Sequence, residues 1–311
     1  MPPEPTSASQ KRLPKRTIIE SIFRELWDDQ AQQLRESVVT LTMVSNAIAA
    51  YNLSNVGSKP VSDRNVANFF KDFIRNKNRA NKNWPELLKS KRFYAKQYTG
   101  DGGCFQFVRY KDGQTEPFEF RTFDYNAQIA EETHKIESIS LPFASKKLVR
   151  KDESWLMQVL VRLRVIETHL ALCSTLEITQ LDLLQMSLKQ KGAEIDGLFL
   201  AMQGLPPSTR ELLVTCEAKM DRDDILEDQI ISQVQAIARM NGVTQAKIVP
   251  MAAKLVGDSE VYVVEFQPVD KEKADELTSL TEASKKVYKL TPEIPGLKLK
   301  KKSLKLPKQK S

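Results

Sequence analysis

Three residues in the second half of the chain have the types and spacing needed for metal-dependent hydrolysis: Asp196, Glu217 and Lys219. Asp196 lies in the apolar segment 194–201, and Glu217 and Lys219 end the apolar segment 212–219. Both segments are typical of core strands. Because side chains alternate between the two faces of a strand, Glu217 and Lys219 share a face. Charged groups at the end of a core strand are costly to bury unless they are paired or bind a metal ion.

A turn at residues 204–207 would place the two predicted strands side by side, so that Asp196 and Glu217 converge on one metal ion. Carboxylate oxygens are the ligands that Mg²⁺ prefers, and the ion usually keeps waters and a substrate phosphate in its other positions. A metal-bound water is a stronger nucleophile, and the cation offsets charge on the phosphorus. Lys219 would orient that water or stabilise the phosphoryl oxygens.

Histidine and cysteine are too scarce to support several other hydrolytic centres. The chain has two histidines, of which His169 follows an apolar segment and is expected in the core. The three cysteines are far apart and form no C-x-x-C pair, so a Cys/His zinc site is poorly supported. Isolated thiols indicate a reducing, intracellular setting, and residues 1–16 lack the apolar stretch of a secretory signal. We therefore expect a cytoplasmic protein with no membrane span, associated with the nucleoid when bound to DNA.

The order of an acidic strand followed by a strand ending in Glu-x-Lys resembles the PD-(D/E)XK nuclease superfamily. The matching residues are Asp196 and Glu217-Ala218-Lys219, while Ile195 stands in place of the proline in the family's name. The resemblance implies a Mg²⁺ ion, replaceable by Mn²⁺, bound by Asp196, Glu217 and the backbone carbonyl of Ala218. It also implies an α/β fold with a restriction-endonuclease-like core, in which helices flank a mixed central sheet.

The same resemblance implies accessory residues on two helices. Family members often add an acidic residue on the first core helix, for which Glu167 is the candidate and Glu153 the second choice. Some members carry a glutamine on the helix that follows the Glu-x-Lys strand. Gln229 and Gln233 lie on one side of that predicted helix.

Residues 17–112 are expected to form a separate domain that resembles a winged helix. Apolar periodicity predicts helices near 18–26 and 35–52, and Ser62 with its neighbour offers an N-cap for a third helix. Alternating aromatic residues on both sides of a Gly/Asp turn at 99–103 predict a β-hairpin. In winged-helix domains the third helix enters the major groove and the hairpin touches the DNA backbone.

The polar side of the predicted third helix carries side chains of the types that reach base edges and phosphates. They are Arg64, Asn65, Asn68, Lys71 and Arg75. These residues are therefore the candidate DNA contacts. A winged helix used only for protein contacts is the alternative.

Positive charge is concentrated in two regions of a chain whose net charge is +7. Segment 64–111 has twelve Lys/Arg and three Asp/Glu, a net of +9, and segment 281–311 has ten Lys and two Glu, a net of +8. Either region could bind a polyanion, and a solvated surface or solubilising tail is the other interpretation.

Composition and patterning together predict five parts. They are a disordered arm at 1–16, a winged-helix-like domain at 17–112, a bridging segment at 113–150, a catalytic domain at 151–272 and a basic disordered tail at 273–311. The chain length agrees with two domains.

The sequence thus predicts a Mg²⁺-dependent endonuclease that cuts double-stranded DNA, most similar in layout to a type II restriction enzyme. One such site hydrolyses one strand at a time, so a homodimer is expected. A repair, transposition or antiphage nuclease of the same fold is the nearest alternative, because fold does not determine function. A DNA-binding protein with a catalytically silent nuclease-like domain is the alternative from another class. The recognition sequence, cleavage pattern and methylation dependence stay open.

Overall fold

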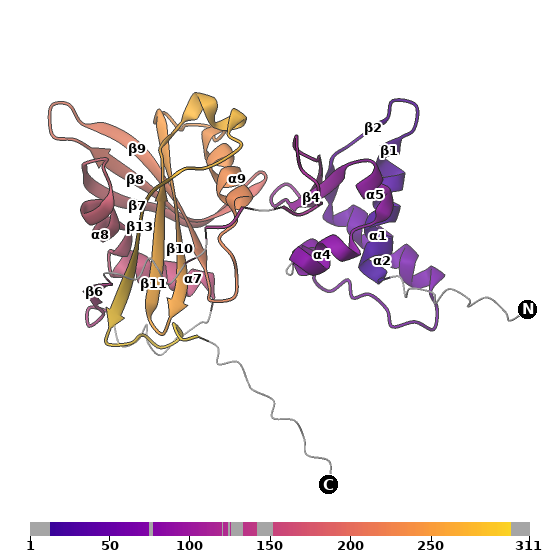
Figure 1. Cartoon of the computed structure of the whole chain (residues 1–311), viewed down its shortest axis with the longest axis horizontal. Coiled ribbons are helices and arrows are strands. Elements are labelled where there is room, and N and C mark those ends of the chain that lie inside the picture. The colour runs from indigo at the N-terminus through magenta and orange to yellow at the C-terminus, as the bar shows by residue number, and fades with distance from the viewer. Residues whose placement is uncertain are drawn as a thin grey trace, which may run out of the picture. The chain divides into compact units, whose positions relative to one another are not determined.

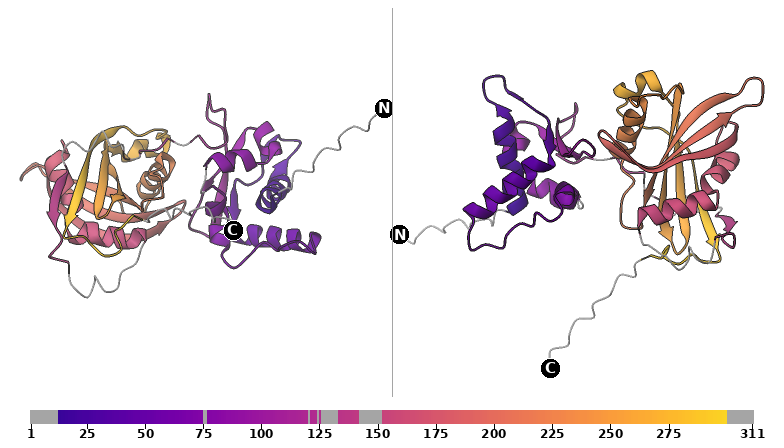
Figure 2. Two further views of the ribbon diagram at one scale, coloured as in Figure 1. Left: turned by 60° about the horizontal axis from the view of Figure 1, so that its bottom comes forward. Right: turned by 180° about the vertical axis from the view of Figure 1, so that it is seen from behind.

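The computed structural model divides the chain into two compact units, residues 1–119 and 120–311 (Figures 1 and 2). The residues that it describes are 13–74, 77–119, 121–123, 125, 133–141 and 152–299. Among them, no helix has the length and apolar character needed to cross a membrane. Each unit is best understood on its own.

The first unit packs helices against a small antiparallel sheet. Helix α1 (Pro14–Leu26) buries its predicted apolar stripe, and α2 (Leu41–Ser54) begins where the Thr40 hydroxyl accepts the Met43 N–H. The predicted hairpin is present as β4 (Phe93–Gln97) and β5 (Gly103–Arg109). A short strand before α2 completes the three-stranded sheet in the order β3-β5-β4. The other elements here are β1 (Trp27–Asp28), β2 (Gln33–Leu34), β3 (Val38–Thr40), α4 (Lys77–Asn83) and α5 (Glu86–Ser90).

The predicted third helix begins later than expected and is shorter. Ser62 does not cap it, because its hydroxyl accepts the N–H of Arg64 in a turn. Only a 3-10 turn, η1 (Val66–Asn68), and the short α3 (Phe69–Ile74) follow. Polar side chains of the Ser62–Asn65 stretch offer the backbone hydrogen bonds that compete with helix formation. The prediction of a continuous helix from Ser62 was therefore wrong.

The second unit is built on a mixed sheet that has eight strands in the described part of the chain. Its strands are β6 (His134–Glu137), β7 (Ile178–Gln190), β8 (Ala193–Gln203), β9 (Arg210–Lys219), β10 (Lys247–Gly257), β11 (Glu260–Phe266), β12 (Val269–Asp270) and β13 (Glu282–Thr291). Their order is β6-β13-β11-β10-β9-β8-β7, with β12 also beside β10. Strands β7 to β9 form an antiparallel meander, and β10 runs parallel to β9 because a helix connects the two.

Helices lie on both faces of this sheet (Figures 1 and 2). Helices α7 (Glu153–Arg162) and α8 (Val165–Cys173) pack on one face, and α9 (Glu227–Ala238) packs on the other. The apolar pattern from Trp155 to Leu163 predicts one helix that could continue through Glu167. In the structure this helix is broken at Arg164, whose φ of 52° is left-handed. The short helix η3 (Lys271–Glu276) also packs beside α9. The predicted α/β class, with a mixed sheet flanked by helices, is confirmed.

Strand β10 extends well beyond its predicted end at Val249. The sequence predicts a strand only over residues 246–249, and Pro250, which follows them, cannot donate to a β-ladder. In the structure Pro250 falls between two partners, since β12 pairs with Lys247 and Ile248 and β11 pairs from Met251 onward. The missing N–H therefore interrupts nothing on that side, and the strand continues.

The domain boundaries differ from those predicted. The expected basic tail from 273 is ordered as far as 299, because β13 joins the sheet between β11 and β6 and buries Tyr288 and Leu290. Lys285, Lys286 and Lys289 of this strand are interspersed with the buried residues Val287, Tyr288 and Leu290. The described part of the expected bridge at 113–150 is likewise divided, since β6 belongs to the second unit's sheet. The predicted arm at 1–16 and the last residues lie mostly outside the described residues.

Candidate active site

Strands β8 and β9 separate at the predicted site. Their paired register ends at Gly197 opposite Cys216, although both strands continue past that point. Just beyond it, the Ala218 N–H donates to Asp196 Oδ2 at 2.8 Å. A side-chain carboxylate thus replaces the missing backbone partner, and Asp196 is held in the fork between the strands.

Glu217 and Lys219 lie next to that fork on one face of β9, and both are buried, with 5% and 7% of their surface exposed. The Lys219 ammonium contacts Glu217 Oε1 directly and lies 3.6 Å from Glu153 Oε1. From the facing helix α9, the Gln233 side-chain amide donates to Glu217 Oε2. Two helices and two strands therefore fix the orientation of one buried carboxylate and one buried lysine.

The three charged groups influence one another strongly. Burial, followed by repulsion from Glu217, raises the pKa of Asp196 to about 8, against the opposing effects of the Ala218 N–H and Lys219. Burial alone would lower the pKa of Lys219, but Glu217 and Glu153 outweigh it and raise that pKa, so the lysine stays charged. When Asp196, Glu217 and Glu153 are all ionised, their combined negative charge exceeds the single positive charge of Lys219.

This donor set fits a hard divalent cation. The carboxylates of Asp196 and Glu217 are close enough for their repulsion to shift a pKa, and a cation between them would relieve it. Among the described residues, no group of three or more His, Cys, Asp or Glu gathers as a metal cluster. Two carboxylates and the Ala218 carbonyl suit Mg²⁺, which keeps several waters, better than an ion that needs a full protein cage.

Glu167 is not the acidic helix residue that reaches this site. Its carboxyl lies on α8, where the nearby charges are Arg164 and Asp182, and burial raises its pKa. The second choice, Glu153, takes that position, since its carboxylate lies 3.6 Å from the Lys219 ammonium. It is the first residue of α7, which Asp152 caps by accepting the Trp155 N–H at 2.9 Å. The break between α7 and α8 separates the two acids, and periodicity alone did not reveal it.

The two glutamines of α9 have different surroundings. Gln233 contacts Glu217 and also donates to the Glu194 carbonyl at 2.9 Å, so the predicted accessory residue lies at the site. Gln229 has a buried side-chain oxygen with no hydrogen-bond partner among the described residues.

The candidate DNA contacts of the first unit lie on its surface. Arg64 and Asn65 occupy the turn, Asn68 the 3-10 helix and Lys71 the start of α3, and all four are exposed. Arg75 lies outside the described residues. The exposed positions agree with a role in binding, although most of them are not on the helix that was expected to carry them.

Sequence reasoning missed one buried charge near the site. Lys254 lies on β10, directly beside Lys219 in the parallel register with β9. It was overlooked because the predicted strand covered only residues 246–249. The apolar residues that continue on both sides of Lys254 were the signal that could have extended the strand.

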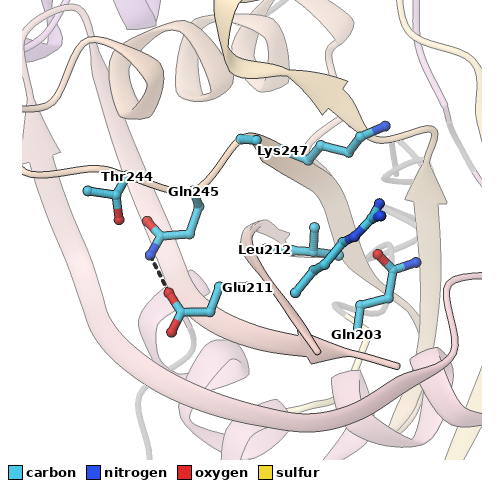
Figure 3. A pocket seen from close by; sticks show the side chains of 8 residues that line it. Gln203, Glu211, Leu212, Thr244, Gln245 and Lys247 are labelled. Carbon is cyan, nitrogen blue, oxygen red and sulfur yellow. Dashed lines mark hydrogen bonds between the residues drawn. The ribbon is translucent and has the colours of Figure 1, made fainter. Parts of the chain in front are cut away.

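A separate pocket of about 310 Å³ lies at the other end of β9 (Figure 3). Arg210 and Lys247 contribute to its wall, and Glu211 is held there by a 2.8 Å hydrogen bond from Gln245. Since β9 begins at Arg210 and reaches the carboxylates only at its last residues, this pocket is distinct from the site.

None of the protein-family models, curated proteins or solved structures compared with this chain matches it.

Proposed function

We propose that the protein is a Mg²⁺-dependent endonuclease that hydrolyses phosphodiester bonds in double-stranded DNA, of the PD-(D/E)XK type and similar in role to a type II restriction enzyme. One observation carries the proposal. Asp196 and Glu217 come from two neighbouring strands, β8 and β9, and lie beside the buried ammonium of Lys219 where the pairing of these strands ends. A salt bridge alone would explain Glu217 and Lys219 but not a second carboxyl in the same fork.

The order of elements around the site supports this reading. Along the chain, helices α7 and α8 are followed by the meander β7-β8-β9, then by helix α9 and by β10, which is parallel to β9. The Glu-x-Lys residues lie on β9, the last strand of the meander and the one that α9 connects to β10. A restriction-endonuclease-like core is expected to have a mixed sheet with helices on both faces. Fold alone would not identify the reaction, so the carboxylates and the lysine carry that step.

Each residue has a distinct part in the proposed chemistry. Asp196, Glu217 and the Ala218 carbonyl would hold Mg²⁺, which supplies Lewis-acid activation of water and charge neutralisation at phosphorus. Lys219 would donate to the attacking water or to a non-bridging oxygen of the phosphate, and its raised pKa keeps it a donor at neutral pH. Glu153 and Gln233 hold Lys219 and Glu217 in orientation.

The choice of DNA as substrate rests on the first unit. Helices α1, α2 and the short α3 precede the hairpin β4-β5, with the short helices α4 and α5 in between, and this layout supports the proposed resemblance to a winged helix. Arg64, Asn65, Asn68 and Lys71 are exposed together on one short segment. Such side chains contact phosphates and base edges. Cleavage of both strands would involve two copies of the chain, each with one site.

A plasmid assay tests the proposal. The protein is incubated with supercoiled DNA and Mg²⁺, and separately with Ca²⁺, which occupies carboxylate sites but supports such hydrolysis poorly. Discrete fragments would indicate a restriction-type enzyme, and nicking or smearing would indicate a less specific nuclease. Tight DNA binding without cleavage in Mg²⁺ or Mn²⁺ would contradict the enzymatic function and favour a silent nuclease-like domain.

A further inference from the structure

A second lysine is buried on the same face of the sheet as the proposed site. Lys254, with 8% of its surface exposed, lies on β10, where the register places it beside Lys219 of β9 and Tyr262 of β11. On that same strand Ala252 lies beside Glu217. Because neighbouring residues of adjacent strands point to the same face, Lys219 and Lys254 extend from the sheet in parallel.

The counter-ions of the two lysines differ. Lys219 is held by buried Glu217 and by Glu153, both within the site. Lys254 lies 3.8 Å from Asp224, on the loop between β9 and α9, and the Asp224 side chain is 46% exposed. A long ion pair to a half-exposed carboxylate contributes little free energy. Asp224 is therefore a counter-ion that a stronger anion could replace.

The two lysines lie on neighbouring strands, which are about 4.8 Å apart in a sheet, and both side chains are largely removed from water, which is costly for a charged group. An apolar side chain of similar length would avoid that cost at the Lys254 position. The arrangement is instead suited to an anion that approaches the site from the carboxyl ends of β9 and β10, where both lysines lie. A DNA phosphate next to the scissile bond has the required charge and several acceptor oxygens.

We propose that Lys254 is a second phosphate-binding residue of the site, held by Asp224 in the free protein and transferred to a DNA phosphodiester when substrate binds. This inference rests on the proposed function and assigns a substrate contact outside the residues that carry it. It makes two separate statements: Lys254 contributes a charge to DNA binding, and Asp224 competes with DNA for that charge.

The test measures DNA affinity in Ca²⁺ across a salt range of about 50–200 mM, for which each phosphate contact adds roughly 0.9 to the salt slope. The variants are Lys254→Met, Lys254→Arg and Asp224→Asn. The control is Lys247→Met, which removes a half-exposed lysine from the other end of β10, where it pairs with Asp270. Thermal unfolding of each variant is followed in parallel.

We expect Lys254→Met to bind DNA about tenfold more weakly with a salt slope lower by about one, and to melt no earlier than the unmodified protein. Lys254→Arg should keep the slope, Asp224→Asn should bind several-fold more tightly, and Lys247→Met should match the unmodified protein. An unchanged affinity and slope in Lys254→Met would overturn this inference alone. If Lys254→Met fails to fold, Asp224→Asn decides, since unchanged or weaker binding by it overturns the proposal. Absence of DNA binding and cleavage by the unmodified protein would overturn the proposed function as well.

Discussion

Asp196 has a proposed part in hydrolysis, and its surroundings in the folded protein are unfavourable for its charged form. Its carboxyl accepts a backbone N–H, yet burial and Glu217 raise its pKa to about 8. Between about pH 4 and 8, the Asp196 carboxyl is therefore mostly protonated in the folded state and mostly ionised in the unfolded chain, whose pKa is near 3.8. Functional groups held in unfavourable surroundings of this kind are common in active sites.

The first prediction concerns the stability of Asp196→Asn in EDTA. Because the folded pKa is raised, the folded state binds more protons than the unfolded state between about pH 4 and 8, and stability falls as pH rises through that window. The asparagine removes the titration and keeps an oxygen for the Ala218 N–H. We expect the variant to be more stable than the unmodified protein at pH 9, by at least about 1 kcal/mol, since a pKa displaced by one corresponds to about 1.4 kcal/mol.

Urea unfolding at pH 4 and pH 9 measures this difference. The two proteins should differ less at pH 4, where the carboxyl is protonated in the folded state and close to half protonated in the unfolded state. A variant that is less stable than the unmodified protein at pH 9 would show that the Asp196 carboxylate stabilises the fold, and the electrostatic account of the site would be wrong.

At the scale of elements, local patterning predicted some parts of the fold and not others. The meander β7-β8-β9 and helix α9 could be predicted because their apolar periods match a strand and a helix, and the Asp196, Glu217 and Lys219 cluster followed from them. Strand β13 could not, because its lysines resemble a tail until β11 and β6 are present to pair with it. The length of β10 beyond Val249 and the break at Arg164 likewise depend on tertiary neighbours. For this reason the sequence did not reveal Lys254, and it favoured Glu167 over Glu153 as the third acidic residue.

The ordered end of the second unit gives the second prediction. A chain that stops at residue 276 loses β13 and six buried apolar side chains: Leu280, Val287, Tyr288, Leu290, Ile294 and Leu297. It also leaves the edge of β11 unpaired, which favours aggregation. We expect the second unit to lose its cooperative thermal transition, whereas a chain that stops at 299 should retain it. Equal melting of the two truncated chains would contradict the part assigned to β13.

The third prediction concerns the short segment that carries the candidate DNA contacts. Arg64→Ala and Lys71→Ala should each weaken DNA binding several-fold and lower the salt slope by about one, because each removes a positive charge that is proposed to contact a phosphate. Arg24→Ala is the control, since Arg24 is exposed on α1 and pairs with Glu20. Fluorescence anisotropy with a labelled duplex measures the affinities. Unchanged binding in both variants would favour a first unit that serves protein contacts.

At the scale of the whole molecule, the proposal of one active site per chain determines how many chains we expect on one DNA duplex. A single pair of carboxylates hydrolyses one phosphodiester at a time, so a double-strand break calls for two chains on one DNA site. The fourth prediction is a complex of two chains per duplex in Ca²⁺, measured by sedimentation. Mixing the unmodified protein with excess Glu217→Gln should yield nicked plasmid in place of linear plasmid. One chain per duplex with full double-strand cleavage would contradict the dimer.

The central claim is that Asp196, Glu217 and Lys219 carry out hydrolysis, and single-turnover plasmid cleavage in Mg²⁺ tests it most directly. We compare Asp196→Asn, Glu217→Gln and Lys219→Met with Glu194→Gln, which neutralises an exposed carboxylate on the same strand as Asp196. We predict that each of the first three lowers the cleavage rate at least about a hundredfold, as loss of one transition-state contact does, while the folded state is retained and Glu194→Gln cuts at the normal rate. Normal cleavage by all three site variants would contradict the account.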